Sequence, residues 1–133
     1  SPSGTSWRNT TMGRSQRDKG KRGERECAQH LRDAFGPAYD VRRGWQPRGA
    51  AVVNEPDVMV THGESGDRLP YWFEVKTGAA PRMRAALEQA TADAPAGVVP
   101  VAWIRFDKLT RPVAVLWGDD LAGLLAALEV ETR

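Results

Sequence analysis

The sequence predicts an α/β domain with a mixed central β-sheet flanked by helices, in the order α-β-β-β-α-β-β-α. Runs rich in β-branched and aromatic residues, such as "YWFEVKT" and "VVPVAWIRF", are bounded by turn residues and indicate strands. Other segments repeat apolar residues at intervals of three and four, which is typical of amphipathic helices. Three consecutive strands with short links indicate a meander, and the second helix then crosses to a later strand.

The three predicted helices cover residues 19–35, 81–93 and 119–129. In the first, Leu31 and Phe35 belong to one apolar stripe, and "FGP" ends the helix. Pro81 suits the first turn of the second helix, and Gly118 or Asp119 is expected as the N-cap of the third.

The five predicted strands cover residues 38–44, 56–60, 71–77, 98–106 and 112–117. Pro56 opens the second strand, a position that tolerates proline. The segment "THGESGDRLP" reads as a hairpin connection, so the second and third strands are expected to pair antiparallel.

The 133 residues are 41% hydrophobic and 27% charged, as in an ordinary globular protein. We expect residues 19–133 to form one domain, and residues 1–18 to be a disordered basic arm or a tag remnant. The single Cys27 excludes an internal disulfide framework and a Cys-rich zinc site. Without a secretory signal or an apolar run of roughly 20 residues, an intracellular location, in the cytoplasm or nucleoid, is expected.

The positive charge is concentrated at the N-terminal end. Residues 1–26 hold seven basic and three acidic residues, a local charge of +4, whereas the whole chain carries +2. A basic segment of this kind is typical of proteins that bind a polyanion, and a solvated tail is the alternative.

Four charged residues are predicted to meet. Glu74 and Lys76 stand two positions apart on a strand and therefore share one face. Asp57 opens the neighbouring strand, and Glu24 lies on the apolar stripe of the first helix, whereas Glu26 projects toward solvent. If the two strands pair, Asp57, Glu74 and Lys76 can share one end of a sheet face, with Glu24 arriving from the helix packed on it.

Three carboxylates beside one ammonium group predict a site for a hard cation. Carboxylate oxygens suit Mg²⁺ or Mn²⁺, which use few carboxylates and keep several waters. A cation held by Asp57 and Glu74 would activate a water and neutralise charge on a phosphate, while Lys76 orients or deprotonates that water or binds the phosphate. The residues together predict a phosphodiester hydrolase, although each signal alone is also explained by a solvated face.

The segment "EPDVMV" followed by "FEVK", with a spacing of 17 from Asp57 to Glu74, resembles the signature of the PD-(D/E)XK nuclease superfamily. The upstream "KGKRGERECAQHL" resembles the opening helix of archaeal-type Holliday-junction resolvases. The likeness covers about residues 19–118 and implies a restriction-endonuclease-like core. The catalytic residues that it implies are Glu24, Asp57, Glu74 and Lys76. The metal ligands that it implies are Asp57, Glu74, Glu24 and the backbone carbonyl of Val75.

This resemblance implies a Mg²⁺-dependent endonuclease, with Mn²⁺ as a possible substitute, that cuts branched DNA in recombination or repair. Paired cuts at a four-way junction imply a homodimer. The insert "THGESGDRL" and the missing serine before Asp57 depart from those resolvases and bear on substrate preference. The alternatives are a nuclease acting on flaps, forks or ordinary duplex DNA, and a non-catalytic nuclease-like DNA-binding module.

Basic side chains near these motifs are candidates for contacts with DNA. They are Lys19, Lys21, Arg22, Arg25, Arg42, Arg43, Arg48, Arg82 and Arg84. Arginines around Trp45 can hold phosphates beside a stacked base, or simply belong to a surface loop. Trp103, Trp117 and the apolar run from Leu121 to Leu128 are expected either at a dimer interface or in the core.

Overall fold

The computed structural model describes the backbone of residues 2–44 and 55–132, and the side chains of residues 17–44 and 55–132. Its elements follow the predicted order. They are α1 (Pro2–Phe35), β1 (Tyr39–Arg43), β2 (Val58–His62), β3 (Tyr71–Gly78), α2 (Met83–Asp93), β4 (Val99–Phe106), β5 (Val113–Val115) and α3 (Gly118–Thr132). No helix of this described part is long and apolar enough to cross a membrane.

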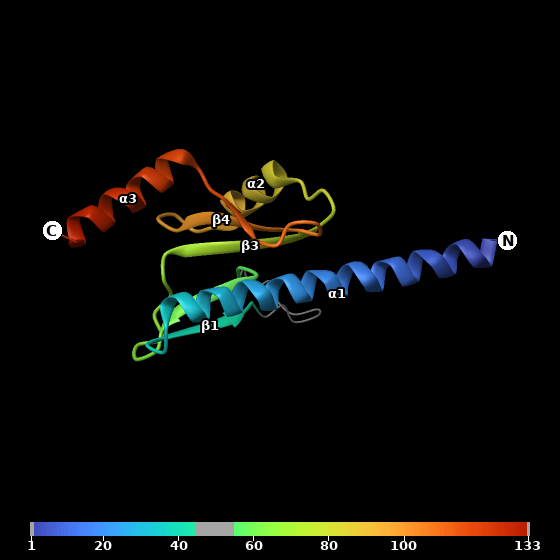
Figure 1. Cartoon of the computed structure of the whole chain (residues 1–133), viewed down its shortest axis with the longest axis horizontal. Coiled ribbons are helices and arrows are strands. Elements are labelled where there is room, and N and C mark those ends of the chain that lie inside the picture. Colours follow the sequence, from blue (N-terminus) through green and yellow to red (C-terminus); the bar gives the residue numbers. More distant parts are fainter. Residues whose placement is uncertain (1, 45–54, 133) are drawn as a thin grey trace.

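The strands form one mixed five-stranded sheet in the order β1-β2-β3-β4-β5. The pairs β1/β2, β2/β3 and β4/β5 are antiparallel, whereas β3 and β4 are parallel and are joined through α2. The expected meander and the crossover are therefore confirmed. Helices α1 and α2 lie on opposite faces of the sheet (Figure 1).

The larger core lies between α1 and the first four strands. Cys27, Ala28 and Leu31 of α1 pack on side chains such as Val60 of β2 and Val75 of β3. On the other face, α2 packs on β4 in a smaller core formed by Ala86, Leu87, Ala102 and Ile104. The alternation of side chains along β3 therefore directs Phe73 and Val75 toward α1, and Glu74 and Lys76 toward the face of α2.

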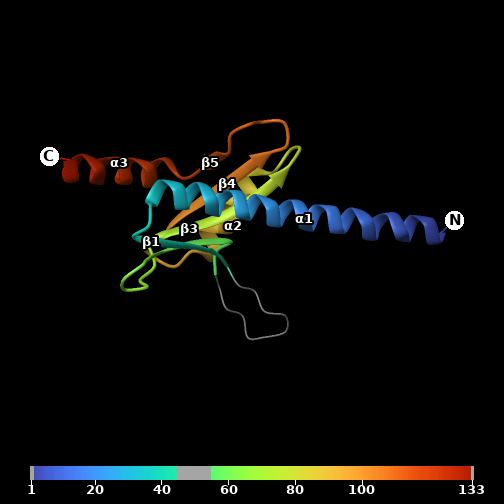
Figure 2. The same cartoon turned by 60° about the horizontal axis from the view of Figure 1, so that its bottom comes forward.

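Helix α1 differs from its prediction at the N-terminal end. It runs without a break from Pro2, where a disordered arm was expected over residues 1–18. A helix that is already nucleated gains one hydrogen bond for each added residue, so it can extend through residues of low helix propensity. The N-terminal part of α1 projects beyond the sheet (Figure 2).

Helix α3 has no buried residue and extends away from the sheet (Figure 1). Leu121, Leu125 and Leu128 are exposed, so packing in the core of this chain does not explain its apolar character. The helix begins at Gly118, and the carbonyl of Trp117 accepts a hydrogen bond from the Leu121 N–H at 3.0 Å. The predicted N-cap at Gly118 or Asp119 is therefore too late by at least one residue.

Candidate active site

Asp57 lies directly before β2, where the ladder between β2 and β3 opens. Its N–H donates to the Phe73 carbonyl at 3.0 Å, and its carbonyl accepts from the Gly44 N–H at 2.9 Å. Its carboxylate Oδ2 accepts a hydrogen bond from the Val75 N–H at 2.9 Å. In the register between these strands, Val58 lies opposite Phe73. The Val75 N–H, further along β3, therefore donates to the Asp57 side chain and not to a backbone carbonyl of the neighbouring strand.

Glu74 and Lys76 flank Val75 on the face that Asp57 shares. Glu74 is only 7% exposed, and its Oε1 lies 3.8 Å from the Lys76 Nζ. Asp57 and Glu74 lie close enough for each carboxyl group to shift the pKa of the other. Two acids and one amine that the strand pattern predicted to converge therefore do lie together.

The two carboxyl groups are hard to ionise together. Burial, and then the charge of Asp57, raise the pKa of Glu74 to about 7, while Lys76 acts in the opposite direction. Burial also raises the pKa of Asp57, against the lowering effect of the Val75 N–H and Lys76. Ionising both groups of such a pair is therefore costly, as is usual for two carboxylates in one small site.

Asp93, the last residue of α2, adds negative charge that acts on both carboxyl groups. No sequence pattern points to this residue, because a single acid at a helix end carries no motif. Its effect on the carboxyl groups follows only from the position of α2 over the sheet face that holds Glu74.

Glu24 reaches this region from the opposite face of the sheet. Its Oε1 lies 3.6 Å from the Nε of Arg43, at the end of β1. Burial and the charge of Asp57 raise the pKa of Glu24, whereas Arg43 and Lys21 lower it. Glu24 is thus within electrostatic reach of Asp57, but the group that it contacts is Arg43. The expectation that its helix packs on the face of Asp57 and Glu74 is wrong, because the apolar stripe of α1 covers the other face.

The carboxylate pair is suited to a hard divalent cation. Within residues 17–44 and 55–132, no group of three or more His, Cys, Asp or Glu side chains is placed to hold a metal ion. The donors that meet are the oxygens of Asp57 and Glu74, whose pKa values are raised chiefly by burial, a cost of ionisation that a bound cation would offset. Two carboxylates fit Mg²⁺ or Mn²⁺, since such ions fill their remaining positions with water.

The basic candidates on α1 lie on the face of the sheet opposite Glu74 and Lys76. Lys19 and Arg22 line a cavity of about 310 Å³ together with Thr77 and Arg105. Lys19 pairs with Asp107 at 2.8 Å. Lys21 and Arg25 are exposed on the same helix. Arg105, which the sequence analysis did not select, adds a further cation to this cavity.

The other basic candidates differ in whether they already form an ion pair within the protein. Arg84 pairs with Glu88 at 2.7 Å on α2, and Arg82 is exposed at the start of that helix without a side-chain capping bond. Arg42 pairs with Glu55 at 3.0 Å. Arg48 and Trp45 lie outside the described residues.

No protein-family model matches the chain, and no curated protein sequence matches it. The likeness to PD-(D/E)XK nucleases therefore remains an expectation drawn from the motifs around Glu24, Asp57, Glu74 and Lys76.

Proposed function

We propose that this chain is a metal-dependent endodeoxyribonuclease with a restriction-endonuclease-like core, most similar to a Holliday-junction resolvase of the PD-(D/E)XK superfamily. The observation that carries the proposal is the meeting of Asp57, Glu74 and Lys76 where β2 and β3 separate. An acid pair beside an amine, on adjoining strands and in this chain order, has the donor types that metal-assisted phosphodiester hydrolysis needs.

Each residue has a distinct part in the proposed reaction. Asp57 and Glu74, with the backbone carbonyl of Val75, would hold the divalent cation, which would supply an activated water and offset charge on the phosphate. Lys76 is 42% exposed at the rim of the acid pair, where its ammonium group can orient the attacking water or bind the phosphate. Glu24 aligns Arg43, whose guanidinium can bind another phosphate oxygen.

The proposed substrate is branched DNA. Lys19 and Arg22 of α1 line a cavity with Thr77 of β3 and offer contacts to phosphates without reading bases. Cleavage of both strands of a junction requires two sites, and the exposed apolar side chains of α3 supply a surface for a homodimer. Flaps, forks and ordinary duplex DNA are alternative substrates for the same site.

A non-catalytic DNA-binding module is the second candidate. It is favoured by the contact of Glu24 with Arg43, which leaves two carboxylates rather than three at the opening of the sheet. In such a module the basic side chains would bind DNA, and the acid pair would be a relic of the fold.

A cleavage assay separates the two candidates. The substrates are a four-way junction, a flap, linear duplex and supercoiled plasmid, each with Mg²⁺ or with EDTA. We expect Mg²⁺-dependent cuts, strongest on the junction, and a loss of about 10²–10⁴-fold in Lys76→Ala. Lys108→Ala, an exposed lysine in the turn after β4, is the matched control and should cut normally.

Two other outcomes of this assay would change the proposal. DNA binding without metal-dependent cleavage, unchanged in Lys76→Ala, would support the module. Equal cleavage of all substrates would retain the nuclease and remove the preference for branched DNA.

A further inference from the structure

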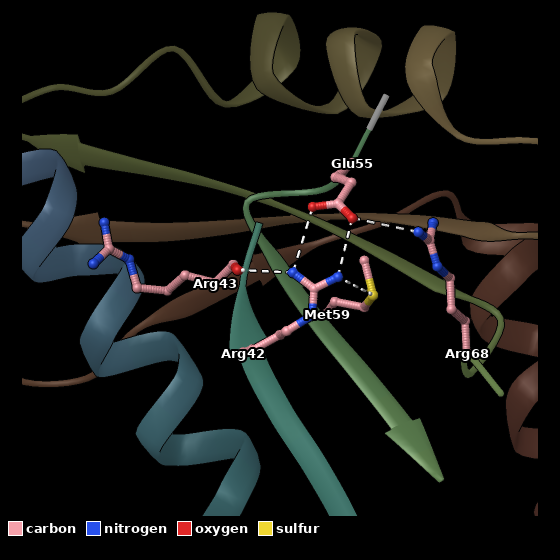
Figure 3. Close-up of polar contacts among 5 residues, drawn as sticks. All are labelled: Arg42, Arg43, Glu55, Met59 and Arg68. Atoms are coloured by element: carbon pink, nitrogen blue, oxygen red, sulfur yellow. Dashed lines mark hydrogen bonds and ion pairs between the residues drawn. The ribbon is translucent and has the colours of Figure 1, made fainter. Parts of the chain in front are cut away.

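The segment that carries Asp57 is held by a second carboxylate, which has no part in the proposed chemistry. Glu55 stands two residues before Asp57, and its side chain is only 9% exposed. Its carboxylate accepts hydrogen bonds from Arg42 of β1 at 3.0 and 3.4 Å (Figure 3). It also accepts one from Arg68, in the connection between β2 and β3, at 3.5 Å.

Arg42 takes part in this cluster although half of its side chain is exposed. Its guanidinium donates to the Arg43 carbonyl at 3.3 Å and contacts the Met59 sulfur at 3.6 Å, besides its two bonds to Glu55 (Figure 3). Four directed contacts leave little of its hydrogen-bonding capacity for a phosphate. These contacts tie β1 to the chain entering β2, whereas the expected DNA contact by Arg42 stays a prediction.

A close approach of two backbones restrains the same segment. The Gly44 N–H donates to the Asp57 carbonyl at 2.9 Å. A Cβ atom at Gly44 would overlap the carbonyl oxygen of Pro56, so only glycine fits there. The chain from Glu55 to Asp57 is thus fixed by an ion-pair cluster at one end and by backbone bonds at the other.

We propose that Glu55 is a positioning residue for Asp57. With Arg42 and Arg68 it sets the direction in which the chain enters β2, and so holds the Asp57 carboxylate against the Val75 N–H. The role of Asp57 as a metal ligand rests on the proposed function. The positioning itself is a property of the metal-free protein and is tested separately.

The direct test is amide hydrogen exchange, followed by NMR in the metal-free protein. In Glu55→Gln we expect the Val75 amide to exchange about tenfold faster, approaching its rate in Asp57→Asn, because its acceptor is no longer held in place. The Val101 amide in β4 reports global stability and should keep its rate. Glu55→Asp, which retains the charge on a shorter side chain, should restore part of the protection of Val75.

Three results would overturn the proposal. One is a Val75 amide that exchanges in Glu55→Gln as in the parent protein. Another is equal acceleration of Val75 and Val101, which would make Glu55 a general structural residue. Additive effects of Glu55→Gln and Arg42→Gln on Val75 exchange would also contradict a cluster that acts as a unit.

Cleavage kinetics give a second readout. We expect Glu55→Gln to raise the Mg²⁺ concentration for half-maximal cleavage about tenfold, with a smaller effect on the rate at saturating Mg²⁺. Leu31→Val, a core substitution on α1 remote from Glu55, controls for lost stability and should leave that concentration unchanged. If the parent protein cuts no DNA, the proposed function fails, while the exchange of the Val75 amide still decides the positioning role.

Discussion

The carboxylate of Asp57 and the backbone N–H of Val75 are joined by a hydrogen bond of 2.9 Å that spans the opening between β2 and β3. Val75 stands between Glu74 and Lys76, so this bond brings an acid from one strand to the acid and the amine of the next. The reactive groups are therefore arranged by the sheet itself, which allows their roles to be tested one at a time.

Stability should fall as the pH rises through the titration of Glu74. The pKa of this group is raised from 4.5 to about 7, so between these values the folded protein keeps a proton that the unfolded chain has lost. We expect urea unfolding in EDTA to show a loss of about 1–2 kcal/mol over this range, after allowing for solvent screening. Glu74→Gln should remove most of this slope, and an unchanged slope would contradict the assignment.

Mg²⁺ should stabilise the protein in the absence of DNA. At about pH 8 Glu74 is ionised, and a cation bound only by the folded state raises the melting temperature by several degrees as its concentration passes the Kd. Asp57→Asn should abolish this shift in differential scanning fluorimetry. Asp40→Asn, an exposed acid of β1, is the control, and a shift that persists in Asp57→Asn would place the ion elsewhere.

Glu24 and Arg43 should be energetically coupled. Removal of Arg43 leaves a half-buried carboxylate without its cation, so we expect Arg43→Gln to destabilise the fold by about 1–2 kcal/mol. A double-mutant cycle with Glu24→Gln should give a coupling of about 0.5–1.5 kcal/mol in urea unfolding. The exposed Arg84–Glu88 pair, expected at about 0.3–0.5 kcal/mol, provides the comparison. Equal coupling energies in both pairs would show that burial does not strengthen the interaction between Glu24 and Arg43.

Two glycines of α1 should respond in opposite ways to alanine. At Gly23 a Cβ atom would overlap the Thr77 methyl group, so Gly23→Ala should destabilise the protein by about 1–3 kcal/mol. At Gly20 no atom lies within 4 Å of the added Cβ, so Gly20→Ala should stabilise the helix by up to about 1 kcal/mol. Thermal unfolding of both variants tests the packing of α1 on β3. Equal shifts in melting temperature would contradict this packing.

The homodimer is testable through α3. Leu125 is 54% exposed on this helix, so Leu125→Glu should convert a dimer to a monomer in analytical ultracentrifugation without changing the circular dichroism spectrum. Leu109→Glu, at an isolated exposed leucine in the turn between β4 and β5, should leave the mass unchanged. A parent protein that is monomeric at high concentration would exclude the proposed dimer.

The order of the elements was predictable because local signals agree with the fold. Gly36 and Pro37 end the first helix where the pattern stops, and the alternation in "YWFEVKT" matches β3 (Tyr71–Gly78). The meeting of Asp57 with Glu74 followed from antiparallel pairing, which the short connection between their strands indicated. These inferences needed only the periodicity of side chains along each element.

The predictions that were wrong depended on how the helices and strands pack together. The stripe on α1 identifies which side of the helix is buried, but not which face of the sheet it covers, so Glu24 was placed with Asp57 instead of Arg43. The Glu55 cluster joins Arg42 and Arg68, each 13 residues away, and depends on the register of Arg42 opposite Met59. No local pattern encodes such a register, since it is set by the packing of the whole sheet.

The separation of α3 from the sheet has an evolutionary consequence. The groups proposed for hydrolysis lie between residues 24 and 76, whereas the exposed apolar helix occupies Gly118–Thr132 and buries none of its residues. Substitutions can therefore accumulate in that helix without touching Asp57, Glu74 or Lys76. Natural selection can revise the surface that this helix presents while the groups at the opening of the sheet are inherited unaltered.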